Sequence, residues 1–226
     1  QIAKSILLQF YNTFYAHGII PKQWKKVKVI YIQKPNFKEV ELQGIRPLSL
    51  ISCMAKVMNH MILVRLEIIV ESLQILSPHQ HGFRKKHSTL NCLTDLQLKI
   101  LSGNDENKSS LCCFLDISGA FNDVSIPHLF NKLRHLHLSP FMTCWISNFF
   151  SNKIYTDGVN TMYGSHGLDQ GSILSPMLFN IYVVDVHNTI QDPSITIMSY
   201  ADDFMLMVQE RSPEFNQEKL KNALFK

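Results

Sequence analysis

Two short apolar segments that border acidic residues place the strongest constraint on how this chain can fold. Leu111–Leu115 is a continuous apolar run followed directly by Asp116. The segment Ile195–Val208 contains two further apolar runs, which enclose Asp202 and Asp203. A continuous apolar run predicts a strand buried on both faces, and two runs around a tight turn predict a β-hairpin. We therefore expect one acid at the end of a buried strand and two acids at the tip of a hairpin.

These acids indicate a magnesium site if the two elements are neighbours in one sheet. Three carboxylates that converge repel one another, and divalent cations relieve this repulsion. Oxygen ligands suit Mg²⁺, which also takes water and substrate phosphate as ligands. Two such ions stabilise the attacking and leaving oxygens of a phosphoryl displacement, which is the chemistry of a polymerase. The alternative is that Asp202 and Asp203 only form a turn and that Asp116 only caps a helix.

The hydrophobic pattern of the other segments predicts an α+β chain, with a sheet layer that has helices on one side. Periodicity, caps and breakers predict helices over residues 1–17, 53–73, 88–101, 125–137, 140–150 and 175–190, and a polar, helix-like stretch over 214–226. They also predict a strand over 25–33 that Pro35 closes, a hairpin over 155–163 and a loop over 102–105.

Composition argues against several classes of protein. With 46% hydrophobic and 18% charged residues and a net charge of +4, the chain is typical of a globular domain with a core. Polar residues interrupt its most apolar stretches, 61–70 and 173–186, so we expect no membrane span, and we find no secretory signal. Five cysteines without a C-x-x-C pair favour reduced, buried thiols in an intracellular protein. His79 and His81 lack a Cys or carboxylate at ligand spacing, which argues against zinc.

Six segments resemble, in the same order, segments of the reverse transcriptases of non-LTR (LINE-type) retrotransposons, and in particular of their jockey-like branch. They are IPKQWKKVKVIYIQKP (20–35), GIRPLSLISCMAKVMNHMI (44–62), LSPHQHGFRKKHSTLNCL (76–93), FLDISGAFNDV (114–124), GLDQGSILSPMLFNIYVVD (167–185) and YADDF (200–204). The resemblance implies an α+β right-hand polymerase with fingers and palm, in which an antiparallel palm sheet is backed by helices and the thumb is absent. The fingers, with an N-terminal helical part, would occupy residues 1–110, and a palm truncated before the thumb would occupy residues 111–226.

The resemblance also implies the metal-binding residues. Asp116 and Asp202, helped by the Ile117 carbonyl, would bind two Mg²⁺ ions, with Mn²⁺ as a possible substitute. Asp203 would be the second acid of the catalytic pair. Phe121 would lie under the sugar of the incoming nucleotide and select dNTP over rNTP by its bulk. The alternative for Phe121 is an ordinary core residue.

Further residues would bind the nucleotide and the nucleic acid. The resemblance implies that Gln170 and Gly171 contact the nucleotide and that Arg46 lies near its triphosphate, because a planar guanidinium suits phosphate oxygens. Basic residues would line the path of template and primer, where each phosphate contact adds a salt-dependent contribution. They are Lys25, Lys26, Lys28, Lys34, Arg84, Lys85 and Lys86. An ordinary solvated face is the alternative for any one of them.

The chain departs from the family pattern at four positions. Asp169 stands where the family has Pro, and we expect it to add a negative charge beside the triphosphate. Gly119 replaces a basic residue, Asn122 replaces Asp and Ile45 replaces Tyr.

The resemblance predicts an RNA-directed DNA polymerase that transfers nucleotides from dNTP to a primer 3′-hydroxyl on an RNA template. Its partners would be an RNA template, a DNA primer and dNTP, with no membrane, together with the missing thumb and endonuclease regions of a parent polyprotein. Its location would be intracellular, in the nucleus or cytoplasm. The alternative is an inactive truncated remnant that keeps the fold and at most binds nucleic acid. A third class, RNA-dependent RNA polymerase, shares the acids, but Phe121 argues against it.

Overall fold

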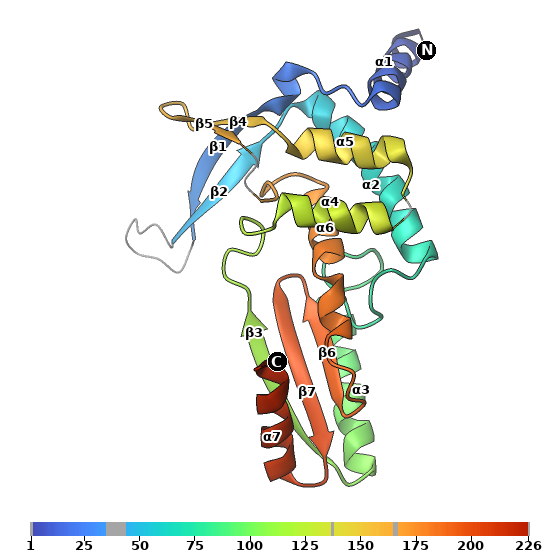
Figure 1. Ribbon diagram of the computed structural model, residues 1–226, viewed down its shortest axis with the longest axis vertical. Helices are drawn as coiled ribbons and strands as arrows, with labels where there is room; N and C mark the ends of the chain where they lie inside the picture. Colours follow the sequence, from blue (N-terminus) through green and yellow to red (C-terminus); the bar gives the residue numbers. More distant parts are fainter. Residues whose placement is uncertain (1, 35–43, 137, 165–166, 226) are drawn as a thin grey trace. The chain divides into compact units, whose positions relative to one another are not determined.

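The computed structural model describes residues 2–34, 44–136, 138–164 and 167–225, and it shows an α+β chain (Figure 1). Two compact units make up the chain, and each contains two separate stretches of sequence. Unit 1 comprises Gln1–Ile69 and Phe121–Phe179, and unit 2 comprises Val70–Ala120 and Asn180–Lys226. The expected division at residue 110 concerns functional subdomains and stays a prediction. Pro35 and His137, expected to end a strand and a helix, lie outside the described residues.

Unit 1 contains a mixed four-stranded sheet in the order β2-β1-β4-β5. Strand β1 pairs with β2 in the antiparallel sense and with β4 in the parallel sense. The strands are β1 (Lys26–Gln33), β2 (Ile45–Leu50), β4 (Lys153–Thr156) and β5 (Thr161–Gly164). The helices are α1 (Ile2–His17), η1 (Lys22–Lys25), α4 (Ile126–His135) and α5 (Pro140–Phe150). The boundary between the units falls within α2 (Cys53–Ser72), after Ile69, and at Phe179 within α6 (Ser175–Tyr182).

Strand β2 is the strand that the sequence pattern did not predict. It contains Pro47, which lacks a backbone N–H and therefore argues against a central strand. The structure places β2 at an edge of the sheet, with Pro47 opposite Tyr31 of β1. At an edge a strand needs hydrogen bonds on one side only, so proline is tolerated there.

Unit 2 contains an antiparallel sheet in the order β3-β7-β6. Its elements are α3 (Thr89–Asp105), β3 (Ser109–Asp116), η3 (Val184–Asn188), β6 (Ile195–Tyr200), β7 (Asp203–Glu210) and α7 (Pro213–Leu224). The predicted hairpin is confirmed, because β6 and β7 pair from Ile195 opposite Val208 to Tyr200 opposite Asp203.

Helices cover both faces of this sheet, so the expectation of helices on one side is wrong. Gln209 and Glu210 are neighbours on β7 and point to opposite faces. Gln209 Nε2 donates to the carbonyl of Lys99 in α3 at 2.9 Å, whereas the Glu210 carboxylate forms an ion pair with Lys219 of α7 at 2.5 Å. Figure 1 shows α3 and α7 flanking the three strands.

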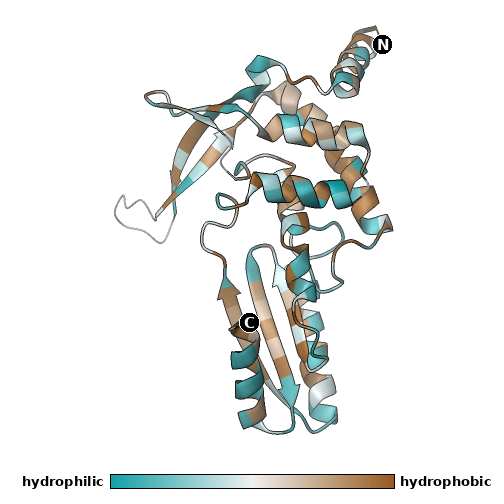
Figure 2. Ribbon diagram, viewed as in Figure 1, coloured by the Kyte–Doolittle hydropathy of each residue, from teal (hydrophilic) through white to brown (hydrophobic). Residues whose placement is uncertain are grey.

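The central strand of this sheet is buried and its β3 neighbour is not. Residues Phe204–Val208 of β7 are all buried, and Met205 and Met207 form a core with Met198, against which Leu96, Ile100 and Cys112 pack. Both strands are apolar (Figure 2). Phe114 of β3 is nevertheless 72% exposed, because β3 is an edge strand. The prediction that the Leu111–Leu115 run forms a strand buried on both faces is therefore wrong for β3, and the buried strand of this sheet is β7.

The structure corrects three further predictions from the sequence. Helix α3 runs on to Asp105, so the predicted loop at 102–105 is wrong. Helix α6 ends at Tyr182, and a 3-10 helix follows in place of a continuous helix to residue 190. All five cysteines are free, but none is buried. Within the described ranges, no helix is both long and apolar enough to cross a bilayer.

We predict that Met207→Ala lowers the free energy of unfolding by about 2–5 kcal/mol, because it opens a cavity at a fully buried position of the central strand. Phe114→Ala, on the exposed edge, should change it by less than about 0.5 kcal/mol. Urea unfolding followed by circular dichroism measures both values. Equal losses for the two variants would contradict this account of the sheet.

Candidate functional site

The three acids gather at one end of the unit 2 sheet. Asp116, the last residue of β3, lies directly opposite Asp203, the first residue of β7. Residues directly opposite one another in an antiparallel pair have Cα atoms roughly 4.5–5.5 Å apart and side chains on the same face. Asp202 lies in the turn just before Asp203. Asp116 and Asp203 are exposed and Asp202 is half-buried. The expectation that the two acidic elements are neighbours in one sheet is confirmed.

The turn that carries two of these acids has an unusual backbone. Tyr200 and Asp203 pair at the end of the hairpin, which leaves Ala201 and Asp202 as a two-residue turn. Ala201 has φ of +59°, in the left-handed region that favours glycine. A non-glycine residue keeps such a conformation only where its surroundings hold it.

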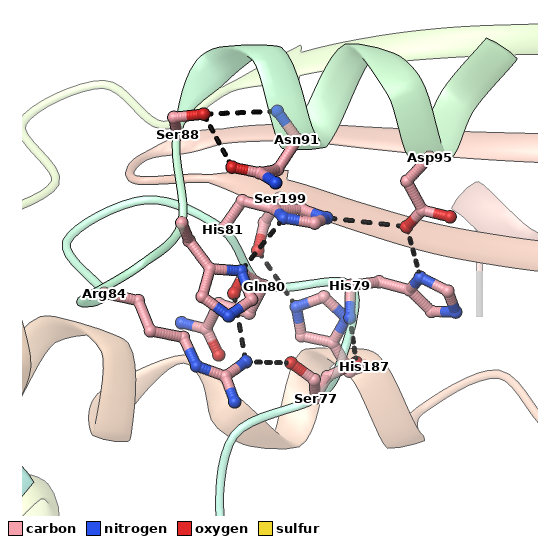
Figure 3. Close-up of polar contacts among 11 residues, drawn as sticks. Ser77, His79, Gln80, His81, Arg84, Ser88, Asn91, Asp95, His187 and Ser199 are labelled. Carbon is pink, nitrogen blue, oxygen red and sulfur yellow. Dashed lines mark hydrogen bonds and ion pairs between the residues drawn. The ribbon is translucent and has the colours of Figure 1, made fainter. Parts of the chain in front are cut away.

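The surroundings of this turn are provided by loop 76–88, which precedes α3 (Figure 3). The Ser199 amide donates to the His79 carbonyl at 2.9 Å, and the His81 amide donates to the Ser199 carbonyl at 2.9 Å. Gly82 then packs against the turn itself. A Cβ at Gly82 would lie 2.0 Å from the backbone nitrogen of Ala201, so no side chain fits there. Loop 76–88 therefore fixes the backbone of the acidic turn from one side.

Two buried amides tie this loop to α6. Gln80 and Asn180 are both fully buried. Gln80 Nε2 donates to the Asn180 carbonyl at 3.3 Å, and Asn180 Nδ2 donates to the Gly82 carbonyl at 2.9 Å. Neither residue could be identified from the sequence pattern, although each lies in a segment that resembles the family. Neither a polar residue in a loop, such as Gln80, nor a polar residue in a short helix, such as Asn180, carries a sequence signal of burial.

A histidine cluster lies at the start of α3 (Figure 3). Asp95 accepts from His79 at 2.7 Å and lies 3.4 Å from His81, whose Nδ1 is 3.2 Å from that of His87. Partial burial is the largest single influence on the Asp95 pKa and raises it, but the hydrogen bonds of His79 and His81 and the charges of His79 and Lys99 together outweigh burial and hold this pKa below its usual range. The sequence offers no carboxylate at ligand spacing from His79 and His81, and the folded chain supplies Asp95, which is distant in sequence but close in space.

His187 lies in η3, and its Nε2 atom is 3.0 Å from the hydroxyl of Ser199 on strand β6 of the hairpin. Burial lowers the pKa of His187 to about 4, so this ring is neutral at physiological pH. The neutral ring can hydrogen-bond with Ser199 without adding charge next to the hairpin.

Arg84 is engaged within the protein. Its Nε and Nη2 atoms donate to the two Glu71 carboxylate oxygens at 2.7 and 2.9 Å, and its Nη1 donates to the Ser77 carbonyl at 2.9 Å. The side chain is 11% exposed. A template phosphate could bind Arg84 only after this ion pair opened.

Within unit 1, three of the expected nucleotide-binding residues adjoin one strand. The Ser49 amide of β2 donates to the Gln170 carbonyl at 2.7 Å. Gly171 has φ of +107°, and a Cβ there would lie 2.9 Å from the Ser49 carbonyl oxygen. Arg46 is exposed on the same strand, three residues before Ser49. The close approach of two backbones explains why a glycine follows Gln170.

Phe121 is half-buried and stacks on the fully buried Phe179 with ring centroids 5.2 Å apart. Its carbonyl accepts from the Leu168 amide at 2.7 Å. The ring is therefore held from one side and partly accessible to solvent.

The basic residues differ in their exposure to solvent. Lys28, Lys85 and Lys86 are exposed, and Lys34 is half-buried. Lys25 donates to the Ser151 carbonyl at 3.0 Å. An exposed lysine is compatible with a phosphate contact and with a solvated face, so these residues stay predictions.

The acids suit a hard cation. In the part of the chain that the structure describes, no three His, Cys, Asp or Glu side chains form a ready-made metal cage. Mg²⁺ does not need one, because it binds through one or two carboxylates and completes its shell with water and substrate phosphates. Asp116 and Asp203 lie opposite each other on β3 and β7, are exposed, and carry carboxylate oxygens of the kind that such a cation binds.

The fold is shared with solved structures of telomerase. Apo telomerase from Candida tropicalis superposes with a TM-score of 0.63 at 11% identity, over 100% of this chain and 46% of that one. A C-terminally truncated form of the same enzyme gives a TM-score of 0.60, over 97% of this chain and 51% of that one. At this identity the similarity concerns the fold alone.

The chain belongs to the reverse transcriptase (RNA-dependent DNA polymerase) family, whose model matches residues 32–224. It is 28% identical to the probable RNA-directed DNA polymerase from transposon BS of Drosophila melanogaster, over 89% of this chain and 23% of that protein. It is also 28% identical to the RNA-directed DNA polymerase from mobile element jockey of Drosophila funebris, over 90% of this chain and 23% of that protein. The resemblance to jockey-like, non-LTR enzymes is confirmed, and the chain spans about a quarter of those relatives' length.

We predict that Gly82→Ala lowers the free energy of unfolding by about 1–3 kcal/mol or more, because its Cβ meets backbone that cannot move aside. Gly103→Ala is the matched control. Its Cβ would meet only the end of the flexible Gln209 side chain, and alanine favours the helix, so the change should stay within about 1 kcal/mol. Thermal or urea unfolding of both variants is the measurement, and a tolerated Gly82→Ala would contradict the role of loop 76–88.

Proposed function

We propose that this chain forms the fingers and palm of an RNA-directed DNA polymerase from a non-LTR retrotransposon. It would transfer nucleotides from dNTP to a primer 3′-hydroxyl on an RNA template. The observation that carries this proposal is the register that sets Asp116 opposite Asp203 at the acidic turn, in a chain of the reverse transcriptase family. We assign residues 1–110 to the fingers and 111–226 to the palm, and we expect the protein to work inside the cell, in the nucleus or cytoplasm.

Each side chain has a distinct task in this proposal. Asp116 and Asp202, with the Ile117 carbonyl, would hold two Mg²⁺ or Mn²⁺ ions, and Asp203 would support them. When bound, such ions neutralise the triphosphate and lower the pKa of the primer hydroxyl. In the reaction, the primer hydroxyl loses its proton to water, its oxygen bonds to the α-phosphorus, and the bond between the α-phosphorus and the pyrophosphate leaving group breaks. The register of the sheet holds the like-charged acids close together, and a bound cation would offset the repulsion between them.

The unit 1 residues would bind and select the nucleotide. Gln170 and Gly171 would contact it through a turn whose backbone is fixed on β2. Arg46 would bind phosphate oxygens with its planar fork. Phe121, backed by Phe179, would exclude a ribose 2′-hydroxyl by contact with its ring. Lys28, Lys34, Lys85 and Lys86 would contact the template and primer, and Arg84 would need to leave Glu71 to do so.

We predict that Asp202→Ala lowers primer extension on an RNA template with Mg²⁺ by on the order of 1,000-fold or more, because several kcal/mol of transition-state stabilisation depend on the bound ions. The assay uses a protein extended to the length of its relatives. Asp105→Asn, an exposed acid at the end of α3, is the control and should keep parental activity. Full activity of Asp202→Ala would refute the assignment.

If the chain is an inactive remnant, we expect it not to bind dNTP with Mg²⁺. If the extended protein extends no primer, and if dNTP with Mg²⁺ leaves its melting temperature unchanged, the proposal fails and the remnant is the better reading. Preferential incorporation of rNTP would favour an RNA polymerase instead.

We further predict that Phe121→Ala raises the kcat/KM ratio of rNTP to dNTP by about tenfold or more, because removing the ring opens space for the 2′-hydroxyl. Phe141→Ala, at an exposed position of α5, is the control for loss of a phenylalanine. If Phe121→Ala lowers stability but leaves the ratio unchanged, Phe121 is a packing residue and not a sugar gate.

A further inference from the structure

A lysine lies completely buried in unit 1, beside the turn that carries Gln170. Lys153, the first residue of β4, is 0% exposed. Its Nζ atom lies 4.1 Å from the centre of the Phe149 ring and 4.4 Å from that of Phe150. Burial of a charged ammonium is expensive unless a counterion accompanies it. The local sequence gives no hint of this, because a lysine at the start of a short strand is usually solvated.

The counterion is Asp169. Lys153 forms an ion pair with one Asp169 carboxylate oxygen, and the Tyr155 hydroxyl donates to the other at 2.9 Å. Lys153 and Tyr155 are two residues apart on β4, so their side chains point to the same face of the strand. Burial lowers the pKa of Lys153, and the charge of Asp169 opposes this shift. Burial beside Asp169 also raises the pKa of Tyr155, which keeps its hydroxyl proton in place as a donor.

This pairing changes the expectation for Asp169. Its side chain is 1% exposed and its charge is balanced by Lys153, so it presents no unpaired negative charge to a bound triphosphate. The carboxylate instead points into the protein and anchors the chain.

The anchored residue directly precedes Gln170. The Ser172 amide donates to the Asp169 carbonyl at 3.2 Å, and the Ser49 amide donates to the Gln170 carbonyl at 2.7 Å. The turn is thus held on one side by β2 and on the other by the two donors of β4. Loss of the β4 donors would leave the Gln170 backbone with its hydrogen bond to β2 but without the side-chain anchor of Asp169 on β4.

We propose that Lys153 and Tyr155 are positioning residues that act through Asp169 to fix the Gln170–Gly171 turn for the incoming nucleotide. This inference rests on the proposed function, because it assumes that the turn binds dNTP. It goes beyond that function by assigning the orientation of the turn to side chains on β4 that never touch the nucleotide.

The first test removes one hydrogen bond without unpairing a charge. In Tyr155→Phe, amide hydrogen exchange at Ser49 should speed up by about tenfold or more, as expected for loss of a hydrogen bond to a charged group. The KM for dNTP in the extended protein should rise by a similar factor while kcat changes less. Tyr163→Phe, on the neighbouring strand β5 and 74% exposed, is the matched control and should change neither quantity.

The second test separates positioning from charge balance. The double variant Lys153→Met with Asp169→Leu leaves no unpaired buried charge, and such replacements are often neutral or stabilising. We expect its melting temperature to recover relative to Lys153→Met alone, while its KM for dNTP stays raised. A KM that returns to the parental value would overturn the proposal, because the pair would then only balance charge.

The two measurements separate this inference from the function on which it rests. If Tyr155→Phe changes exchange at Ser49 but not KM, or KM but not exchange, the positioning role is refuted. If neither changes, it is refuted as well. If the parental extended protein binds no dNTP, the proposed function fails, whereas the exchange experiment still reports whether β4 holds the turn.

Discussion

The in-register pairing of β3 with β7 is the constraint on which the candidate site depends. It sets Asp116 opposite Asp203, so acids that are 87 residues apart in the sequence face each other across two strands. A shift of this register by one residue would turn one acid to the other face of the sheet. The register is stabilised by burial of the central strand, where Met205 and Met207 pack with Met198 against α3. The geometry of the acids is therefore set by an apolar core that contains none of them.

A second constraint acts on the turn itself. Loop 76–88 keeps the left-handed backbone of Ala201 in place, because Gly82 leaves room for the Ala201 amide. The loop also forms hydrogen bonds with both the amide and the carbonyl of Ser199 on β6. The buried amides of Gln80 and Asn180 hold the loop in turn. Unit 1 uses the same principle with different chemistry, since an ion pair anchors the residue before Gln170. In both units, buried polar groups fix the backbone next to a residue to which we assign a functional role.

The sequence predicted most of this fold because local patterns decide it. The apolar runs predicted β3, β6 and β7, and Ser88 predicted the start of α3, where its hydroxyl caps the helix. Strand β2 was missed because Pro47 is acceptable only at an edge, and edge position is a property of the whole sheet. The acids were predicted as a set, since they follow apolar runs directly.

The supports of the site could not be predicted in the same way. Lys153 looks like a surface residue until its distant partner Asp169 is known, and Asp95 meets His79 only in the folded chain. Burial of a polar side chain depends on partners far away in the sequence, and the local hydrophobic pattern does not indicate it. The same holds for Gly82, whose need for space arises from a hairpin more than a hundred residues later.

The central claim is that Asp116 and the acidic turn form one metal site. The most direct measurement is anomalous diffraction from crystals soaked with Mn²⁺ and dNTP, since Mn²⁺ accepts the same oxygen ligands as Mg²⁺. The account predicts anomalous density within bonding distance of the Asp116 and Asp202 carboxylates, and its loss in Asp116→Asn crystals. Density that appears only elsewhere, or that survives the substitution unchanged, would contradict it.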